Sequence, residues 1–350
     1  MGEAKKVNSP VALIMAGGSG TRFWPLSQKN LPKQYLRFSG EKSLIQQTVE
    51  RIRTLCKTED IYISSSGTQK SLLQEHLPDI SNLILEPTPK NTAACLMLSA
   101  ATLLKRGYAP STPMMVFPAD HAIGNSAHFV ELLKKAVSFA SSQNSLVTLG
   151  IIPTSPHTGY GYIESGELIQ ADVLTVKRFT EKPEQKTAEA FLKQGGYFWN
   201  SGIFIWTLGS IAAAFDSFLS ESWKRILDCD SEATLKEVFN SLPSLPIDTA
   251  VMERAKNVFV LPAGDLQWSD LGSWSALFEL KTQNAKENVF LSGNVKQMDA
   301  SGCLVQVSSG LNVALIGTED LVVIEHNGNL LIAKKSLDQK VKDISQQFEA

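Results

Sequence analysis

Three glycines placed directly after an apolar segment are the feature of this sequence that most restricts its fold. Residues 11–15 (Val-Ala-Leu-Ile-Met) are apolar without alternation, which is typical of a strand buried on both faces of a parallel sheet. Gly17, Gly18 and Gly20 follow at once. Because glycine permits positive φ and close approach of the backbone to a ligand, successive amide groups there can point at phosphate oxygens. The segment predicts either a phosphate-binding loop or a tight turn at the end of a strand.

Two common phosphate loops can be compared with this one. A Walker loop needs a lysine directly after its last glycine, but Thr21 and Arg22 follow here. A dinucleotide fingerprint needs a third glycine and an immediate helix, whereas Phe23 takes that glycine's place and Pro25 disfavours the helix. Arg22 adjoins the loop and Lys33 follows it. Two cations beside a glycine-rich strand end favour a triphosphate site of another kind.

Strands and helices alternate through the first part of the chain, which predicts βαβ units and a mostly parallel, doubly wound sheet. We expect longer strands within 160–206, added to the same sheet. After about Ala285, short apolar segments between Gly, Asn and Ser predict an all-β unit of β-helix type, followed by a helix that begins at Ser336. We therefore expect a catalytic domain over residues 1–285 and a small C-terminal domain over 286–350.

Composition excludes several classes of protein. The chain has 350 residues and a formal net charge of -2, so it offers no bulk attraction to nucleic acid or to an anionic membrane. Its apolar runs are too short to span a bilayer. The four cysteines form no C-x-x-C pair and the histidines lack metal-ligand spacing, which argues against zinc and for a reducing compartment. We expect a soluble, cytoplasmic α/β protein.

A second candidate segment is Phe-Pro-Ala-Asp-His at residues 117–121, where Asp120 follows a buried apolar strand. Ligands of open α/β sheets bind at the carboxyl ends of strands, and a carboxylate there suits Mg2+, which prefers oxygen ligands and substrate phosphates. The alternative is that Asp120 simply caps the next turn. His121 is expected to shape the loop and not to act as a general base.

The glycine segment resembles a known family signature. Residues 16–27 (Ala-Gly-Gly-Ser-Gly-Thr-Arg-Phe-Trp-Pro-Leu-Ser) and 31–34 (Leu-Pro-Lys-Gln) resemble the mannose-1-phosphate guanylyltransferases of the sugar-nucleotide pyrophosphorylase superfamily, and the similarity runs through most of the chain. The resemblance implies a Rossmann-like mixed sheet of the nucleotide-diphospho-sugar transferase type with a small C-terminal domain similar to a left-handed β-helix. It implies that the nucleotide is bound by Ala16, Gly17, Gly18, Gly20, Thr21, Arg22 and Lys33.

The same resemblance implies roles for several other segments. Residues 268–274 (Trp-Ser-Asp-Leu-Gly-Ser-Trp) resemble the family's second metal-binding segment, so Asp270 joins Asp120 as a ligand of Mg2+; the alternative is an aromatic core turn. Residues 86–92 imply nucleotide binding by Glu86, Asn91 and Thr92, in which Glu86 or a loop carbonyl accepts hydrogen bonds from guanine, although simple helix N-capping is an equal alternative for any single residue here. Residues 246–254 are expected to be structural. The implied sugar-phosphate ligands are Gly161, Glu181, Lys182, Asn200 and Asp270.

The implied reaction joins GTP and mannose 1-phosphate to give GDP-mannose and pyrophosphate. The residues expected to touch the reacting phosphates are Arg22, Lys33, Asp120, Lys182 and Asp270. Two alternatives remain: a nucleotidyltransferase for another sugar 1-phosphate or nucleotide, and a non-catalytic subunit that senses GDP-mannose. Gln28 stands where the family usually has Arg, which puts triphosphate affinity in question. We also expect the C-terminal region to be the place where two copies would form a homodimer.

Overall fold

The computed structural model describes residues 9–18, 20–38, 40–170 and 172–348. Ser19 of the glycine loop lies outside the described residues. The described chain forms two compact units. Unit 1 is drawn from Met1–Gly17, Gln46–Ala119 and Gly124–Leu266, and unit 2 from Gly18–Ile45, Asp120–Ile123 and Gln267–Ala350.

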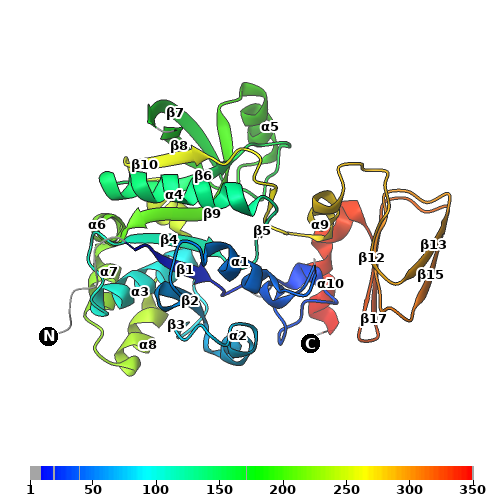
Figure 1. The fold of residues 1–350 in the computed structure, drawn as a ribbon, viewed down its shortest axis with the longest axis horizontal. Coiled ribbons are helices and arrows are strands. Elements are labelled where there is room, and N and C mark those ends of the chain that lie inside the picture. The colour runs from blue at the N-terminus through cyan, green and yellow to red at the C-terminus, as the bar shows by residue number, and fades with distance from the viewer. Residues whose placement is uncertain (1–8, 19, 39, 171, 349–350) are drawn as a thin grey trace. The chain divides into compact units, whose positions relative to one another are not determined.

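Unit 1 is built on one large mixed sheet, whose described strands run in the order β3-β2-β1-β4-β9-β6-β10-β8-β7 (Figure 1). Neighbours from β3 to β4 pair in parallel, as their continuous apolar runs predict. The strands are β1 Val11–Met15, β2 Ile61–Ser66, β3 Leu83–Glu86, β4 Pro113–Pro118, β6 Leu146–Ile151, β7 Tyr162–Gln170, β8 Val173–Thr180, β9 Tyr197–Thr207 and β10 Val258–Pro262.

The later strands make the sheet mixed. β9 lies between β4 and β6 and is antiparallel to both, so the two parallel strands are not direct neighbours. β7 and β8 pair with each other antiparallel, while β10 is parallel to β6 and antiparallel to β8. The expected α/β class and the addition of the later strands to the same sheet are confirmed.

Helices cover both faces of this sheet. Met114 and Val116 of β4 share an apolar cluster with α3, whereas the next residue, Phe117, packs edge-on against Phe129 of α4 at 6.0 Å between centroids. Because successive strand residues face opposite ways, α3 and α4 lie on opposite faces. The helices are α1 Leu44–Ile52, α2 Lys70–His76, α3 Thr92–Lys105, α4 Ser126–Ser142, α5 Gln185–Gln194, α6 Leu208–Phe218, α7 Ser220–Leu227 and α8 Glu232–Ser241, with a π-helical turn at Asp248–Met252.

Unit 2 contains the β-rich C-terminal segment. Its described strands form the parallel ladder β12-β14-β16, to which β17 adds antiparallel, and a separate parallel pair β13-β15. These elements are β12 Val289–Ser292, β13 Asn294–Met298, β14 Leu304–Gln306, β15 Asn312–Ile316, β16 Leu321–His326 and β17 Asn329–Lys334, and the unit also holds β5 Ala122–Ile123, β11 Trp268–Ser269, α9 Trp274–Lys281 and α10 Val341–Phe348.

One apolar core joins the parts of unit 2. Phe23 and Trp24, which follow the glycine loop, pack in the same buried cluster as Trp274 of α9 and Leu304 of β14. The ring of Trp274 contacts Phe23 edge-on at 4.8 Å, and its Nε1–H donates to the carbonyl oxygen of Trp24 at 3.3 Å. The glycine loop is therefore packed together with the C-terminal strands, and the boundary expected after residue 285 stays a prediction.

The end of the chain differs in detail from its expected form. A 3-10 turn spans Lys335–Lys340, where the sequence predicts the helix start, and α10 begins only at Val341. Among the apolar residues of this segment, Val341 is buried, whereas Leu337, Ile344 and Phe348 are exposed. Within the described part of the chain, no helix is long and apolar enough to cross a membrane.

Candidate active site

The glycine loop places Lys33 against the backbone that follows β1. Gly20 has φ 61 and ψ 31, in the left-handed region, and caps a 3-10 turn over Thr21–Phe23. A Cβ on Gly20 would overlap the Cβ of Lys33 and lie 2.9 Å from its backbone nitrogen. The side-chain amide of Gln34 donates to the carbonyl oxygen of Gly18 at 3.1 Å. Glycine at position 20 is therefore required both by its φ and by the close approach of the Lys33 segment.

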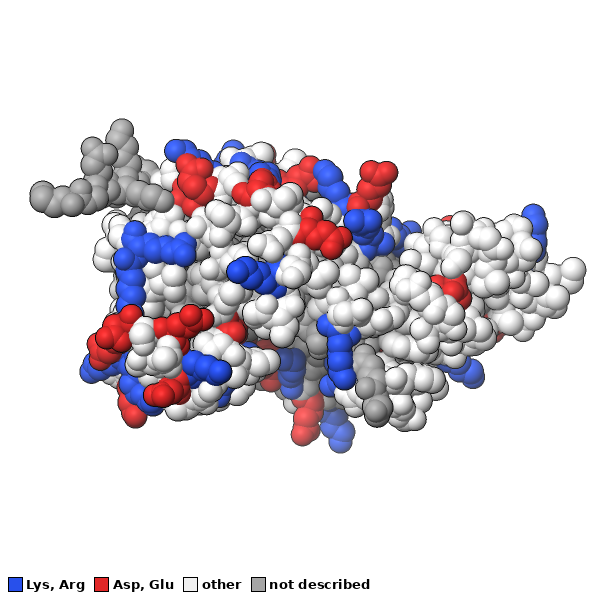
Figure 2. Space-filling model, turned by 90° about the horizontal axis from the view of Figure 1, so that it is seen from below, with Lys and Arg blue, Asp and Glu red and all other residues white. Residues whose placement is uncertain are grey.

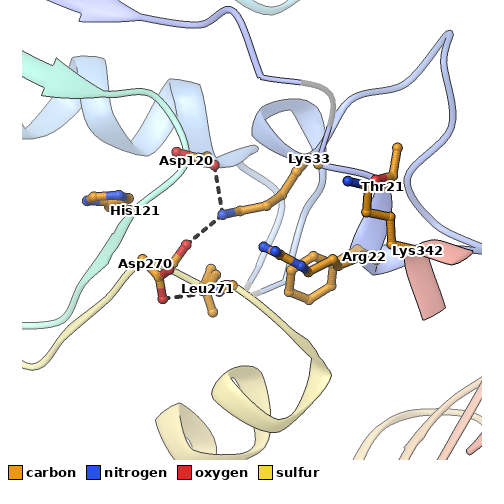
Figure 3. Close-up of a pocket in the computed structure, with 11 residues that line it drawn as sticks. Thr21, Arg22, Lys33, Asp120, His121, Asp270, Leu271 and Lys342 are labelled. Carbon is orange, nitrogen blue, oxygen red and sulfur yellow. Dashed lines mark hydrogen bonds and ion pairs between the residues drawn. The ribbon is translucent and has the colours of Figure 1, made fainter. Parts of the chain in front are cut away.

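A polar cavity of about 350 Å3 lies within unit 2, beside this loop (Figure 3). It is lined by the loop, by residues that follow β4, by the segment after β11, and by α10. The side chains expected to touch the phosphates in this unit, those of Arg22, Lys33, Asp120 and Asp270, all line it. The lining residues are Gly20, Thr21, Arg22, Phe23, Lys33, Asp120, His121, Asp270, Leu271, Gly272 and Lys342.

Lys33 lies between the two acidic segments. Its ammonium is 2.7 Å from Oδ2 of Asp120 and donates to the backbone oxygen of Asp270 at 2.6 Å (Figure 3). The Lys33 side chain is only 7% exposed, so its charge needs this pairing. Burial acts to raise the pKa of Asp120, but the ammonium of Lys33, followed by a contribution from His121, outweighs it and holds that pKa below its ordinary value.

Short strands bring the two aspartates together. β5 and β11 pair antiparallel, with Ala122 opposite Ser269 and Ile123 opposite Trp268, so Asp120 and Asp270 both flank this pair. Oδ1 of Asp270 accepts from the backbone N–H of Gly272 at 3.1 Å, which orients the carboxylate. Trp268 Nε1–H donates to Nδ1 of His121 at 3.2 Å. The imidazole of His121 therefore makes a structural contact, in agreement with its expected role in shaping the loop.

The donor set of this cavity fits a hard divalent cation. Carboxylate oxygens of Asp120 and Asp270 line the same space, and Mg2+ in proteins takes one or two carboxylates together with water and substrate phosphates. Among the described residues, no group of three or more His, Cys, Asp or Glu side chains forms a complete metal cage. Two carboxylates beside a polar cavity therefore suit an ion that shares its coordination with a ligand.

Glu86 lies in unit 1, at the end of β3 and next to Gly17. Its Oε1 accepts from the hydroxyl of Ser64 at 3.1 Å, and a Cβ on Gly17 would be 3.7 Å from that oxygen. Burial raises the pKa of Glu86, against which the Ser64 hydrogen bond acts. Ala16 is held by a hydrogen bond from its N–H to the Ser64 carbonyl oxygen at 2.7 Å. Ala16, Gly17 and Glu86 are thus brought together within this unit.

The residues after Glu86 make structural contacts. Oδ1 of Asn91 accepts from the N–H of Thr92 at 2.8 Å as the N-cap of α3, and the Thr92 hydroxyl accepts from the N–H of Ile247 at 2.8 Å. Lys90 donates to the carbonyl oxygens of Asn240 and Leu242. In this structure Asn91 therefore caps α3, and Lys90 helps to fix the end of α8.

The expected sugar-binding residues form a second cluster in unit 1. Asn200 donates its backbone N–H to the carbonyl oxygen of Gly161 at 2.8 Å, and a Cβ on Gly161 would lie 2.7 Å from Oε2 of Glu181. Glycine at 161 therefore leaves the space that the Glu181 carboxylate occupies. Lys182, at φ 46, pairs with Glu181 at 2.5 Å and is largely exposed. Gly161, Glu181, Lys182 and Asn200 are all brought together.

Two polar residues next to these sites were not assigned to them by sequence reasoning. Asp248, in the segment expected to be structural, accepts from Nδ2 of Asn200 at 2.8 Å. Burial, and then the nearby Glu181 carboxylate, raise its pKa to about 7. Lys342, near the C-terminus, lines the cavity of unit 2. The sequence does contain a signal for Asp248, because the Ile-Asp pair at 247–248 lies in a segment that resembles the family's pattern.

Gln28 makes a local contact. Its side-chain amide donates to the carbonyl oxygen of Pro25 at 3.3 Å, and its backbone pairs with Leu31. Among the described residues that line the cavity of unit 2, Gln28 does not appear. The departure from the family pattern thus falls in the turn that shapes the loop.

A mixed α/β sheet and a cavity lined by a glycine loop, basic side chains and two aspartates define a nucleotidyltransferase architecture. Comparison with known proteins gives the same class. The family model described as nucleotidyl transferase matches residues 11–287, and a mannoseP isomerase/GMP-like beta-helix domain model matches residues 293–348. The chain belongs to the nucleotidyl transferase family and, within it, to the mannose-1-phosphate guanylyltransferases.

The similarity to individual relatives covers nearly the whole chain. An Escherichia coli mannose-1-phosphate guanylyltransferase is 34% identical over 361 residues, which cover 98% of this chain and 76% of the relative. A Salmonella typhimurium mannose-1-phosphate guanylyltransferase is 36% identical over 344 residues, which cover 95% of this chain and 71% of the relative. The crystal structure of a mannose-1-phosphate geranyltransferase from Thermus thermophilus superposes with a TM-score of 0.90 at 33% identity, covering 98% and 100% of the two chains.

Proposed function

We propose that this enzyme transfers GMP from GTP to mannose 1-phosphate, giving GDP-mannose and pyrophosphate. The observation that carries the proposal is the cavity of unit 2, where the glycine loop, Arg22 and Lys33 lie beside Asp120 and Asp270. Cations and backbone amides suit a triphosphate, and the two carboxylates suit Mg2+. The names of the relatives supply the sugar phosphate and the guanylyl group.

The reaction needs alignment and charge neutralisation more than it needs a base. A sugar phosphate is already a competent nucleophile at neutral pH, so its oxygen attacks the α-phosphorus and the bond to the leaving pyrophosphate breaks. Arg22, Lys33 and the backbone amides of Gly18, Gly20 and Thr21 hold the leaving pyrophosphate. Asp120 and Asp270 would hold Mg2+, which neutralises phosphate charge when it is bound.

The remaining roles in the proposal belong to residues of unit 1. Ala16, Gly17 and Glu86 contact the nucleoside, and the Glu86 carboxylate accepts N–H groups of guanine; Asn91 and Thr92 support this segment. Glu181 and Asn200 bond sugar hydroxyls, and Gly161 leaves room for the Glu181 carboxylate that does so. Lys182 neutralises the phosphate of mannose 1-phosphate. The clustering of Gly161, Glu181 and Asn200 supports the sugar assignment.

Single substitutions in the cavity of unit 2 test the proposal. Asp120→Asn or Lys33→Ala should lower pyrophosphate release by about 100- to 1,000-fold, as the loss of one preorganised charge contact commonly does. Lys29→Ala is the matched control, because Lys29 is exposed, lies in the same loop and does not line the cavity. Circular dichroism checks that each variant is folded. Near-normal turnover of either cavity variant would contradict the assignment.

A substrate panel separates the proposal from its two alternatives. Pyrophosphate release is measured with four nucleoside triphosphates against mannose, glucose and heptose 1-phosphates. The proposal expects the highest kcat/KM for GTP with mannose 1-phosphate. A higher kcat/KM for another pair of nucleotide and sugar phosphate would show that the enzyme uses those substrates instead. Tight binding of GDP-mannose without turnover would identify a sensing subunit.

We also propose that two copies form a homodimer through the C-terminal strands. Met298 of β13 and Ile316 of β15 are opposite each other in the parallel register and are each more than 60% exposed. On the face that Figure 2 shows, the surface of the C-terminal strands carries few charged side chains. An exposed apolar pair with few charges around it is suited to self-association.

A cytoplasmic location is part of the proposal as well. All four cysteines are free thiols, and Cys56, Cys95 and Cys303 are buried. Burial raises the pKa of the Cys56 thiol to about 12, which keeps it unreactive. Free, unreactive thiols suit a reducing compartment. Cell fractionation with an antibody against this chain is the test.

A further inference from the structure

The C-terminal helix of unit 2 is attached to the loop that follows Gly20. Val341, the first residue of α10, is buried in the cluster that contains Phe23 and Trp24. At the other end of the helix, the ring of Phe348 stacks on Trp24 with centroids 5.1 Å apart and planes 2° from parallel. Two contacts, one at each end, fix α10 beside this loop.

This attachment places Lys342 in the cavity. Lys342 follows the buried Val341 and lines the same space as Arg22 and Lys33. Within the part of the chain that the structure describes, the Lys33 ammonium is paired with Asp120, whereas no carboxylate pairs with the Lys342 ammonium. The Lys342 charge is therefore available for an anionic ligand.

The charges in the cavity are arranged in order. In Figure 3, Asp120 and Asp270 lie at one end, Lys342 lies beside Thr21 at the other, and Lys33 and the side chain of Arg22 lie between them. A polyphosphate whose reacting phosphate meets the aspartate end, where a cation can bridge, extends its outer phosphates toward the basic end. Coulombic attraction between the outer phosphates and the basic side chains favours that direction over the reverse.

We propose that Lys342 is a further substrate-binding residue, which contacts the β- and γ-phosphates of the nucleotide and hence the pyrophosphate product. The proposal rests on the proposed function and adds to it. It gives the C-terminal domain a part in nucleotide binding, because the helix that ends this domain supplies the side chain. Removing this contact should weaken the binding of ligands that contain a free pyrophosphate group and leave the binding of other ligands unchanged.

The reverse reaction tests this most sharply, because its two substrates separate the roles. In the full-length enzyme, Lys342→Ala should raise the KM for pyrophosphate by about three- to ten-fold, the range of an exposed charged contact, and leave the KM for GDP-mannose unchanged. The difference should shrink at high salt. Lys340→Ala is the control, since Lys340 is an exposed lysine two positions away that does not line the cavity. Lys342→Arg should restore most of the affinity.

A binding measurement makes the result independent of turnover. Calorimetric titration with inorganic tripolyphosphate should show weaker binding to Lys342→Ala than to the wild type and the Lys340→Ala control. Equal affinities for all three proteins would overturn the proposal, as would an equal rise in both KM values. If the wild type does not act on GDP-mannose, the proposed function fails, and the tripolyphosphate titration alone then decides the role of Lys342.

Discussion

Two residues, Gly20 and Lys33, explain why the glycine loop has its form. Gly20 must be glycine because its φ is positive and because Lys33 lies where a side chain would be. The sequence allows a correct guess that Lys33 belongs to the loop, since both lie within one short segment. It could not predict the pairing of Lys33 with Asp120 or the carbonyl of Asp270, because those contacts depend on the strand pair β5-β11.

The Lys33 ammonium and a divalent cation compete for the same carboxylate. The ammonium lies 2.7 Å from Oδ2 of Asp120, and Asp120 is one of the two carboxylates that would hold Mg2+, so both cations would be attracted to the same side chain. We therefore predict that Lys33→Met strengthens Mn2+ binding to the nucleotide-free protein by at least about ten-fold, measured by electron paramagnetic resonance. Lys340→Met, which removes an exposed charge outside the cavity, should change it little. Unchanged Mn2+ affinity in Lys33→Met would contradict this competition.

Asp248 should make stability fall as pH rises. Burial and Glu181 raise its pKa to about 7 in the folded protein, whereas an unfolded Asp titrates near 4. The folded state thus retains a proton that the unfolded state loses, so this group's stabilisation is complete below about pH 4 and is lost as pH rises to about 7. Asp248→Asn, whose amide oxygen can still accept from Asn200, should raise the melting temperature more at pH 8 than at pH 5.

The exposed Asp230 provides the control for this experiment. Asp230→Asn changes the same charge without removing a buried carboxylate, so its effect on the melting temperature should be similar at both pH values. An Asp248→Asn effect that is equal at pH 5 and pH 8, or larger at pH 5, would show that the carboxylate is not destabilised by its surroundings.

At the scale of elements, the sequence predicts what is local and misses what depends on pairing. β8 Val173–Thr180 is one of the longer strands expected within 160–206, and α3 Thr92–Lys105 is one of the helices expected between the first strands, because their apolar patterns lie within the segment. β13 lacks such a local pattern, because most of its residues, such as Lys296 and Gln297, are polar and exposed. The position of β9 between β4 and β6 follows from non-local pairing, which no local pattern encodes.

Trp274 holds α9 to the loop that follows Gly20. Its ring is fully buried against Phe23, and its Nε1–H donates to the Trp24 carbonyl oxygen. We predict that Trp274→Ala lowers the free energy of unfolding by about 3–5 kcal/mol, the usual cost of removing a buried aromatic side chain. Trp274→Phe keeps a ring but leaves the carbonyl unpaired, at about 1–3 kcal/mol. Urea unfolding measures both, and a wild-type midpoint for Trp274→Ala would rule out this anchoring role.

At the scale of the whole molecule, the loop and the C-terminal strands share one core. Phe23, Trp274 and Leu304 belong to the same buried cluster although the sequence places them in different regions. The alternation of elements predicts the α/β class and the short segments predict the β-rich end. Neither pattern could reveal that the end of the chain reaches the nucleotide loop, since α10 is attached through contacts between residues far apart in sequence.

The proposed homodimer gives a prediction at this scale. Light scattering after size-exclusion chromatography should report about twice the chain mass of 38.2 kDa. Replacing the exposed pair by charges, as Met298→Lys with Ile316→Glu, should give a monomer that remains folded, because surface substitutions change stability little. A monomeric wild type, or a dimer that survives both substitutions, would refute this surface as the interface.

The proposed reaction, transfer of GMP from GTP to mannose 1-phosphate, is tested most directly by phosphorus NMR. The products are followed when the purified enzyme is mixed with GTP, mannose 1-phosphate and Mg2+. We expect GDP-mannose and pyrophosphate in equal amounts, no pyrophosphate without the sugar phosphate, and loss of both products in Asp120→Asn and Asp270→Asn. Turnover that persists without mannose 1-phosphate, or is undiminished in both aspartate variants, would contradict it.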